Sequence, residues 1–527
     1  MVRRIIVWLT LALLAADALA AARPNVVLIV SDDQTYRDFG FMGNRLVRTP
    51  HLDRLAEQSA RYPNGYVPTS VCSPSLATLL TGLYPHQHGI HYNHPPPGNS
   101  KFNRMTSRAE YERVRSRSFE LIRSQPTLPR LLAAEGYRCL QTGKFWEGHY
   151  RNAGFTDGMT VFAPPVGQNY GGLRKLAGGE PAAHGNGDLG LKIGRETMQP
   201  IYDFIDECAG RTPFLVWYAP YLPHQPHDSP KKYFDLYRGD HRVSPHYVPY
   251  YASISQFDDT VGELVDHVEK KGLARETLFV FVVDNGWTPG TRRHKTDKDF
   301  FYHTKESKRS PFEDGLRTPI LLRWDGVIRP ATHASLCSSV DIVPTILSAL
   351  GIESKMPGRP GVDLMVSAKG VAELQSRPVF GDIYPGDATS LGHPSRDVAY
   401  RWVREGDFKL IVPQPQQGRS AWGDYLDAVA LFDVVRDPGE TKNLAGIPGS
   451  GAGWSGSQDC WTTGGRRETI PEFPNPDRFH EPQTIQPPCR PRCRRVRLGT
   501  IRRSRPTRGL PVQIPCRLLD VWRASFE

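Results

Sequence analysis

The chain has 527 residues, of which 66 are Lys or Arg and 55 are Asp or Glu, so its formal net charge is +11. Hydrophobic residues make up 39% and aromatic residues 10%, a composition typical of a globular protein with a large core and a smaller second domain. These values exclude an all-disordered chain, a collagen-like repeat and a multi-span membrane protein. The eight cysteines are too sparse for a disulfide scaffold.

The first 20 residues have the layout of a secretory signal peptide. Arg3 and Arg4 precede an apolar run over residues 5–16, and Ala18-Leu19-Ala20 forms an A-x-A cleavage pattern. The run is shorter than the roughly 20 residues that a bilayer-spanning helix needs, and an uncleaved anchor is the alternative interpretation. We expect cleavage after Ala20, a protein exported to the periplasm or secreted, and no stable membrane insertion.

Strands and helices alternate from residue 25 onward. Residues 25–30 read N-V-V-L-I-V, a β-branched run typical of a strand buried on both faces, and Thr49-Pro50 offers an N-cap and first-turn proline. In chain order we expect a strand at 25–30, helices at 50–60, 74–82 and 127–135, a strand at 137–141, a helix at 195–208, a strand at 214–218, a helix at 247–271, strands at 278–283 and 319–322, and a helix at 341–350. This order predicts an α/β fold over residues 21–360, with a large, mostly parallel sheet flanked by helices.

The pattern changes after about residue 360. Short strands are expected at 379–382, 398–403, 408–411 and 431–434, with few helices between them. We therefore predict a smaller antiparallel C-terminal sheet subdomain over residues 361–445, packed on the first domain.

Residues 446–527 differ in composition from the rest of the chain, with 14 Arg, no Lys and four of the eight cysteines. Three interpretations are open: an Arg-rich segment for anionic polymers, a disordered extension, or translation in a shifted reading frame. This tail also holds seven acidic residues, and the first 22 residues carry a charge of +1, which leaves only +3 for residues 23–445. The charge therefore gives no case for nucleic acid as a partner.

Carboxylates follow two of the predicted buried strands. Asp32 and Asp33 come at the carboxyl end of the first strand, and Asp284-Asn285 follows the strand at 278–283. Ligands of open α/β sheets bind at this edge, and an all-oxygen set suits Ca²⁺ or Mg²⁺. Each pair alone is as well explained by helix N-caps, but together they favour a metal site.

A cysteine stands near the predicted start of a helix, where the helix N-terminus stabilises negative charge. The segment from Cys72 to Gly82 reads C-S-P-S-L-A-T-L-L-T-G and resembles the sulfatase signature C-x-P-S-R followed by a small apolar run ending in T-G. The resemblance implies that a formylglycine-generating enzyme converts Cys72 to formylglycine (3-oxoalanine), whose hydrated aldehyde is the nucleophile. A small buried cysteine, or an unprocessed thiol in a sulfatase-like site, are the alternatives.

The resemblance to the sulfatase family extends from Arg23 to about Ala445. It implies an alkaline phosphatase-like fold, with Asp32, Asp33, Asp284, Asn285 and the modified Cys72 around a metal. Three further segments carry the match, T-G-K at 142–144, P-Y-L-P-H-Q-P at 220–226 and K-R-S-P-F-E at 308–313. They imply that Lys144 and Lys308 bind the sulfate and that His224 faces the leaving oxygen. The closing L-F-D and D-P-G-E-T-K-N-L at 431–444 also match.

The chain departs from the family pattern in three places. The signature arginine is Leu76, which puts the conversion of Cys72 in question. The usual histidine two residues after the lysine is Trp146, and His149 is close enough to substitute, although a surface loop position is as well supported. A reading frame lost near residue 446 would remove the family's last helix. His86, His88, His91 and His94 can line the substrate mouth, and ordinary loop positions explain them equally well; His227 can also reach the site.

These residue types suit sulfate ester hydrolysis. A cation and two lysines neutralise the sulfate oxygens, and a histidine can protonate the departing alkoxide. We therefore predict an exported sulfatase that uses formylglycine and Ca²⁺, with Mg²⁺ less favoured, on a sulfated small molecule or polysaccharide. The alternatives are a phosphodiester or phosphonate hydrolase on the same fold, and an inactive family member that binds sulfated glycans.

Overall fold

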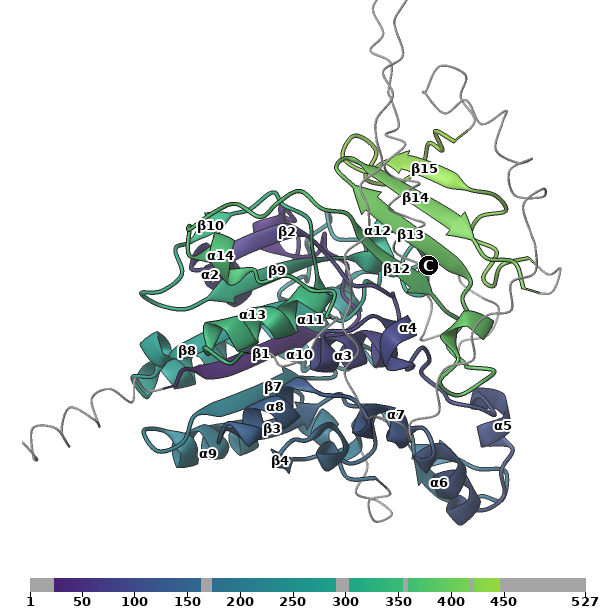
Figure 1. Cartoon of the computed structure of the whole chain (residues 1–527), viewed down its shortest axis with the longest axis horizontal. Helices are drawn as coiled ribbons and strands as arrows, with labels where there is room; N and C mark the ends of the chain where they lie inside the picture. The colour runs from purple at the N-terminus through teal and green to yellow at the C-terminus, as the bar shows by residue number, and fades with distance from the viewer. Residues whose placement is uncertain (1–22, 163–172, 291–302, 354–358, 417–419, 446–527) are drawn as a thin grey trace, which may run out of the picture. The chain divides into compact units, whose positions relative to one another are not determined.

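The computed structural model describes residues 23–162, 173–290, 303–353, 359–416 and 420–445 (Figure 1). Described residues up to Asn443 belong to one compact unit. The predicted signal peptide (1–20) and the Arg-rich tail (446–527) lie outside the described residues. Within the described part, none of the helices is both long enough and apolar enough to cross a membrane.

The predicted mostly parallel sheet is confirmed. Among the described residues it has nine strands in the order β10-β2-β9-β8-β1-β7-β3-β4, with β11 paired to β2. The run β8-β1-β7-β3-β4 is parallel, whereas β9 is antiparallel to both β8 and β2. The strands are β1 (Asn25–Ser31), β2 (Ala60–Tyr66), β3 (Arg138–Gly143), β4 (Asp157–Gly158), β7 (Phe214–Ala219), β8 (Thr277–Val283), β9 (Arg317–Arg323), β10 (Ala331–Thr332) and β11 (Cys337–Ser338).

Strand β1 lies between β7 and β8, and all seven of its residues are buried. Its side chains alternate between two cores, as the pleat of a strand requires. Val26, Leu28 and Val30 pack into one core, and Val27 and Ile29 pack into the other. A strand covered on both faces has no polar side, which explains its continuous apolar sequence.

Helices cover both faces of this sheet. The core that contains Val26 receives α3 (Cys72–Thr81), α8 (Leu128–Ala134), α13 (Ile342–Ala349) and α14 (Met365–Ala368) (Figure 1). The core that contains Val27 receives α2 (Pro50–Glu57), α9 (Gln199–Cys208) and α11 (Val248–Lys270). Because α14 still packs into the core of the large sheet, residues slightly beyond 360 contribute to the larger layer.

Short elements fill the connections. Phe102, Tyr111, Leu176 and Ala182 form a small separate core between helices α5 and α6 and the hairpin β5–β6. The short helices are α4 (Pro85–His88), α5 (Asn99–Asn103), α6 (Arg108–Ser116), α7 (Phe119–Arg123), α10 (Lys231–Asp235), α12 (Glu313–Leu316), η1 (Gly40–Met42), η2 (Tyr150–Ala153), η3 (Asp188–Lys192), η4 (Ala274–Glu276), η5 (Ser339–Asp341) and η6 (Pro394–Arg396), and the hairpin strands are β5 (Leu173–Lys175) and β6 (Pro181–Ala183).

The predicted second sheet is also confirmed, as four antiparallel strands β12 (Val379–Ile383), β13 (Tyr400–Glu405), β14 (Phe408–Pro413) and β15 (Ala430–Asp433). Trp402 packs with Tyr66 of the large sheet and donates its indole N–H to the Pro68 carbonyl at 3.2 Å. Beneath this contact, the fully buried Lys409 Nζ lies 3.1 Å from Glu313 Oε1 and 2.8 Å from Glu440 Oε1. Apolar packing and a buried charge cluster thus fix the small sheet to the large one.

Two expectations differ from the structure. The helix predicted to reach residue 60 ends at Glu57, and β2 follows at Ala60–Tyr66. Strand β2 contains Pro63 and Gly65, residues that disfavour strands, and its pairing with β9 shifts register between Tyr62 and Gly65. The bulge accommodates Pro63 and Gly65, and these two residues are the reason that the sequence pattern does not predict this strand.

Candidate active site

The acidic residues meet at the carboxyl end of the parallel strands. In the register of β1 and β8, Ser31 is paired with Val283, so Asp32 and Asp284 leave the sheet side by side. The loop after β7 reaches the same point, because Asp32 N–H donates to the Leu222 carbonyl at 3.1 Å. Asp32 and Asp284, 252 positions apart in the sequence, are thereby adjacent, as expected at this edge of an open α/β sheet.

A tight backbone turn holds Asp33 against Asp284. Asp33 has φ of +61°, a left-handed conformation that is uncommon for residues other than glycine. Its N–H donates to Asp284 Oδ1 at 3.0 Å, and Asn285 Nδ2 donates to Asp33 Oδ1 at 2.7 Å. Gly286 allows the backbone at Asp314 to pack against this turn, since a Cβ at Gly286 would lie 1.8 Å from the Asp314 carbonyl oxygen.

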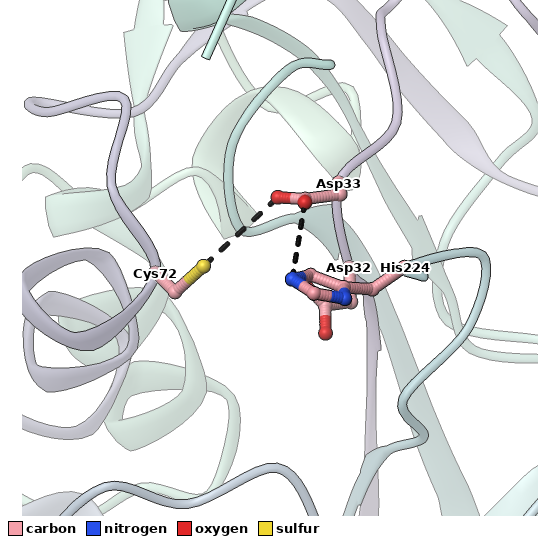
Figure 2. Close-up of side chains that lie close together, drawn as sticks. All are labelled: Asp32, Asp33, Cys72 and His224. Atoms are coloured by element: carbon pink, nitrogen blue, oxygen red, sulfur yellow. Dashed lines mark hydrogen bonds and ion pairs between the residues drawn. The ribbon is translucent and has the colours of Figure 1, made fainter. Parts of the chain in front are cut away.

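Cys72 is the first residue of α3, and its side chain is directed at Asp33 (Figure 2). Its Sγ lies 3.9 Å from Asp33 Oδ1, and the residue is 1% exposed. The Ser73 N–H in the same turn donates to Asn93 Oδ1 at 3.0 Å. Burial raises the pKa of the Cys72 thiol to about 11, although Lys144 opposes the shift, so the unmodified side chain is a neutral thiol at pH 7.

Two buried lysines neutralise the carboxylates. Lys144 Nζ lies 2.5 Å from Asp32 Oδ1 and 3.8 Å from Asp284 Oδ2, and Lys308 Nζ lies 2.6 Å from Asp33 Oδ1. Burial alone would lower the pKa of both lysines, but the carboxylates outweigh it and raise both. Burial likewise acts to raise the pKa of Asp33, yet Lys308 holds it below the usual value. Both lysines therefore carry their charge in the site.

His224 completes the cluster on the side of Asp33 (Figure 2). Its Nδ1 donates to the Gln225 carbonyl at 2.7 Å, which leaves Nε2 as the second nitrogen, 3.3 Å from Asp33 Oδ2. Burial lowers the pKa of His224 well below its usual value, so the ring is neutral at pH 7. A neutral ring held in this tautomer presents the Nε2 lone pair, and that atom can take up or deliver a proton.

The oxygens of this cluster fit a cation. Asp32 Oδ2, Asp284 Oδ2 and Asn285 Oδ1 are buried and have no hydrogen-bond partner in the described part of the chain. Single ligand atoms of Asp32, Asp33, Cys72 and His224 all lie within 4.8 Å of one another. Carboxylate and amide oxygens are acceptors that hard divalent cations satisfy. The donor set therefore suits Ca²⁺ or Mg²⁺.

The cluster opens into a pocket of about 430 Å³. Of the residues predicted from the sequence, Asp33, Cys72, Lys144, His224 and Lys308 line it, and Asp32, Asp284 and Asn285 lie directly behind. Other lining residues come from loops, namely Asn93, His94, Trp146, His184, Asn186, Tyr221, Gln225, Trp287, His303 and Arg309. The matched segments contain Tyr221, Gln225 and Arg309, and sequence reasoning also reaches His94 and Trp146. No sequence signal points to the other five, because separate loops bring them together.

The structure does not bring His149 into this pocket. Its Nδ1 accepts the Arg151 N–H at 3.2 Å, and its ring packs on Tyr150 with centroids 4.5 Å apart. Three other candidate histidines have partners outside the pocket lining: His86 with Asp382, His88 with Thr78 and His91 with Asp397. His227 does not line the pocket but packs on Trp287, which does, and on Tyr250. Cys139, Cys208 and Cys337 are buried and free, as expected of core cysteines.

Comparisons with known proteins agree with this geometry. The sulfatase family model matches residues 24–352, more than half of the chain. Human (Homo sapiens) arylsulfatase A is 28% identical over 476 residues, which cover 83% of this chain and 86% of the relative. The N-acetylgalactosamine-6-sulfatase of Mus musculus is 25% identical, covering 84% of this chain and 85% of the relative.

Among solved structures, a sulfatase from Pseudoalteromonas sp. shares the fold with a TM-score of 0.58 at 19% identity, covering 82% of this chain and 87% of that one. The sheet edge, the cysteine at the start of α3 and the paired lysines thus occur in a chain that matches sulfatases over most of its length. The chain belongs to the sulfatase family and is a hydrolase acting on sulfuric esters.

Proposed function

We propose that this chain hydrolyses a sulfate ester on a carbohydrate, using a formylglycine made from Cys72 and a bound divalent cation, Ca²⁺ in preference to Mg²⁺. The observation that carries the proposal is the position of Cys72. Cys72 is the first residue of α3 and lines the pocket, with its Sγ 3.9 Å from Asp33 Oδ1. The buried lysines Lys144 and Lys308 line the same pocket. A nucleophile at residue 72 would therefore face a sulfate group that the two lysines bind by their positive charge.

The charge balance of the site favours a sulfate monoester. With Asp32, Asp33 and Asp284 ionised against Lys144 and Lys308, the cluster has one net negative charge. A divalent cation changes this to one net positive charge, which a sulfate ester, with its single negative charge, neutralises. A phosphate monoester dianion would leave the buried site negative again.

Each side chain then has a role that its position supports. Lys144 and Lys308 bind the sulfate oxygens and hold the ester in line with residue 72. His224 takes up the proton of the attacking hydroxyl on its Nε2 lone pair and then delivers that proton to the leaving oxygen. Asp32, Asp33, Asp284 and Asn285 would hold the cation, which supplies Lewis-acid stabilisation of the sulfate charge when bound. A carbohydrate substrate is supported by the N-acetylgalactosamine-6-sulfatase relative and by Tyr221 and Trp287 on the pocket wall.

One observation favours a second candidate, a member that binds sulfated glycans without turnover. Leu76, one helical turn after Cys72, is 3% exposed and packs in the core. The resemblance implies an arginine at this position that supports the modified residue. If Leu76 prevents conversion, Cys72 remains a thiol that is protonated at pH 7.

Mass spectrometry of the tryptic peptide that contains Cys72 tests the proposal. The protein is produced together with a formylglycine-generating enzyme, and Cys72→Ala provides the unmodified reference. We expect the peptide to lose sulfur and gain an aldehyde that reacts with a hydrazide. An unmodified thiol together with no hydrolysis of aryl sulfates would refute the enzymatic proposal and support the binding protein.

Matched aryl sulfate and aryl phosphonate substrates separate the proposed reaction from phosphonate hydrolysis. We expect a higher kcat/KM for the sulfate, and a higher value for the phosphonate would favour the alternative.

Export is proposed from residues 1–20, and N-terminal sequencing of the mature protein tests it. Sequencing is expected to begin at Ala21.

A further inference from the structure

Three aromatic rings form a cluster on the pocket wall that the proposed chemistry does not use. His94, Trp146 and His184 come from three separate loops, and all line the pocket with Cys72 and Lys144. The ring centroids are 5.9 Å apart for His94 and Trp146, and 5.7 Å apart for the two pairs that contain His184. We call these three residues the ring cluster.

One nitrogen on each ring of the ring cluster has no protein partner among the described residues. Trp146 Nε1, His94 Nδ1 and His184 Nδ1 are buried without a hydrogen bond to the described residues, and so is Oδ1 of the adjacent pocket residue Asn186. Trp146 is 7% exposed, His94 8% and Asn186 2%. Buried polar atoms are normally hydrogen-bonded, so this group of four is suited to a ligand. An indole N–H can only donate, which requires an acceptor on that ligand.

A buried cation lies behind the cluster. The Arg115 guanidinium carbon lies 5.8 Å from the Trp146 ring centroid, and Arg115 is 1% exposed. Its Nε and Nη1 have no hydrogen-bond partner, and it forms no ion pair with a carboxylate of the described residues. A buried charge without a partner is costly, and an anion nearby reduces that cost. A positive field therefore acts on the ring cluster.

Other charged groups add to the same field. Arg309 lines the pocket, and Asp33 is the single carboxylate among the lining residues that the structure describes. Burial lowers the pKa of His94, with smaller contributions from Arg115, His184, Arg174 and Arg309, so its ring is neutral and can donate one proton without a charge of its own. Glu147 and Asp188 near Arg115 are buried, and burial raises their pKa values to about 8 and about 6, which weakens them as counter-charges.

We infer that the ring cluster and Asn186 form a subsite for a second anionic group on the sugar whose sulfate ester is cleaved at residue 72. This inference rests on the proposed function and specifies its substrate class as a sulfated sugar with another carboxylate or sulfate. Trp146, His94 and His184 donate to the anionic oxygens, and Asn186 Oδ1 accepts from a ring hydroxyl. Arg115 acts through Trp146 as a positioning residue and does not touch the sugar.

Steady-state kinetics of Trp146→Phe test the subsite. The substrates are a hexose monosulfate, a hexose disulfate and a hexuronic acid sulfate. We expect the wild type to prefer both dianionic sugars, and the variant to lose about tenfold to a hundredfold of that preference through KM, the usual effect of one hydrogen bond to a charged group. If Trp146→Phe loses the preference for the hexuronic acid sulfate alone, the second group is a carboxylate. If it loses the preference for the hexose disulfate alone, the second group is a sulfate.

Trp324→Phe is the matched control, because it also removes an indole N–H, which there bonds to the Arg275 carbonyl at 2.9 Å away from the pocket. It is expected to keep the wild-type preference. Arg115→Gln is expected to lower the preference and Arg115→Lys to retain most of it, since only the latter keeps the charge. Thermal melting of each variant identifies any that do not fold.

Two outcomes would overturn the subsite. One is a wild type that hydrolyses aryl sulfate but does not distinguish the monosulfate from the dianionic sugars. The other is Trp146→Phe lowering kcat/KM equally for all sugars, which indicates a purely structural role. If aryl sulfate is not hydrolysed at all, the proposed function fails separately, and calorimetric binding of a free hexuronic acid to wild type and Trp146→Phe decides the subsite. Equal affinities would then refute it.

Discussion

Substitution of Asp284 separates its role in cation binding from its role in holding the backbone. Asp284 is fully buried, and its Oδ1 accepts the N–H groups of Asp33 at 3.0 Å and Asn285 at 2.6 Å. Its Oδ2 has no hydrogen-bond partner and is the oxygen available to a cation. Asp284→Asn keeps an acceptor for both N–H groups but removes the charge, whereas Asp284→Ala removes both functions.

The two variants should therefore differ in stability. Loss of the acceptor leaves two buried N–H groups unpaired at about 1–3 kcal/mol each, so Asp284→Ala loses roughly 2–6 kcal/mol. A folded part of some 420 residues has an unfolding entropy of about 0.9 kcal/mol/K, so this loss lowers Tm by roughly 2–7 °C. Asp284→Asn should melt near the wild type in chelator, because burial raises the pKa of Asp284 and its charge contributes little without a cation.

Calcium titration with thermal melting measures the second role. A cation at one hundred times its Kd stabilises the native state by about 2.7 kcal/mol, which corresponds to a rise in Tm of about 3 °C here. We expect this rise in the wild type and in neither variant. A calcium-dependent rise retained by Asp284→Asn would refute the assignment of Oδ2, and equal destabilisation of both variants in chelator would refute the backbone role of Oδ1.

Three other predictions follow from the same reasoning. His224→Ala should slow alkyl sulfates far more than aryl sulfates, because only the poor leaving group requires the proton that Nε2 takes up and passes on, and equal slowing in kinetic assays would contradict this role. Lys409→Met should lower the free energy of unfolding by about 3–5 kcal/mol, because Glu313 and Glu440 stay buried without their shared cation. Urea unfolding measures this loss, and a value below about 1 kcal/mol would contradict the role of Lys409. Burial raises the pKa of Asp38 to about 7 in the folded state, against 3.8 in the unfolded chain. Between about pH 4 and 7 the folded state therefore binds a proton that the unfolded state has lost, and the free energy of unfolding falls as the pH rises through this range. Asp38→Asn keeps the acceptor for Asn44 and removes the titration, so urea midpoints from pH 4 to 8 should fall less steeply than in the wild type.

The sequence predicts the parts of the fold that follow from local pattern. The apolar runs of β1 and β8, each ended by acidic residues, predict both the parallel sheet and the edge where Asp32 and Asp284 meet. Strand β2 escapes prediction because Pro63 and Gly65 interrupt its pattern, and only the bulge against β9 reveals how they fit.

The site divides in a similar way. Cys72, Lys144, His224 and Lys308 follow from motifs, and the structure places all four in one pocket. Loop residues such as His184 follow from no motif, since tertiary packing decides which loops meet. His149 illustrates the same limit, because five residues of spacing from Lys144 do not determine which way a loop side chain points.

The charge cluster at Lys409 has a consequence for the order of events during synthesis. Glu440 accepts the N–H of Glu313 at 2.6 Å, and Glu313 begins α12 only five residues after Lys308. The loop that carries Lys308 is therefore held by a side chain that is synthesised some 130 residues later. On a ribosome, the parallel sheet can assemble while the loop that carries Lys308 still lacks this contact. A chain that stops between Glu313 and Leu431 would contain each motif named above except the last and still lack the contact that anchors the loop.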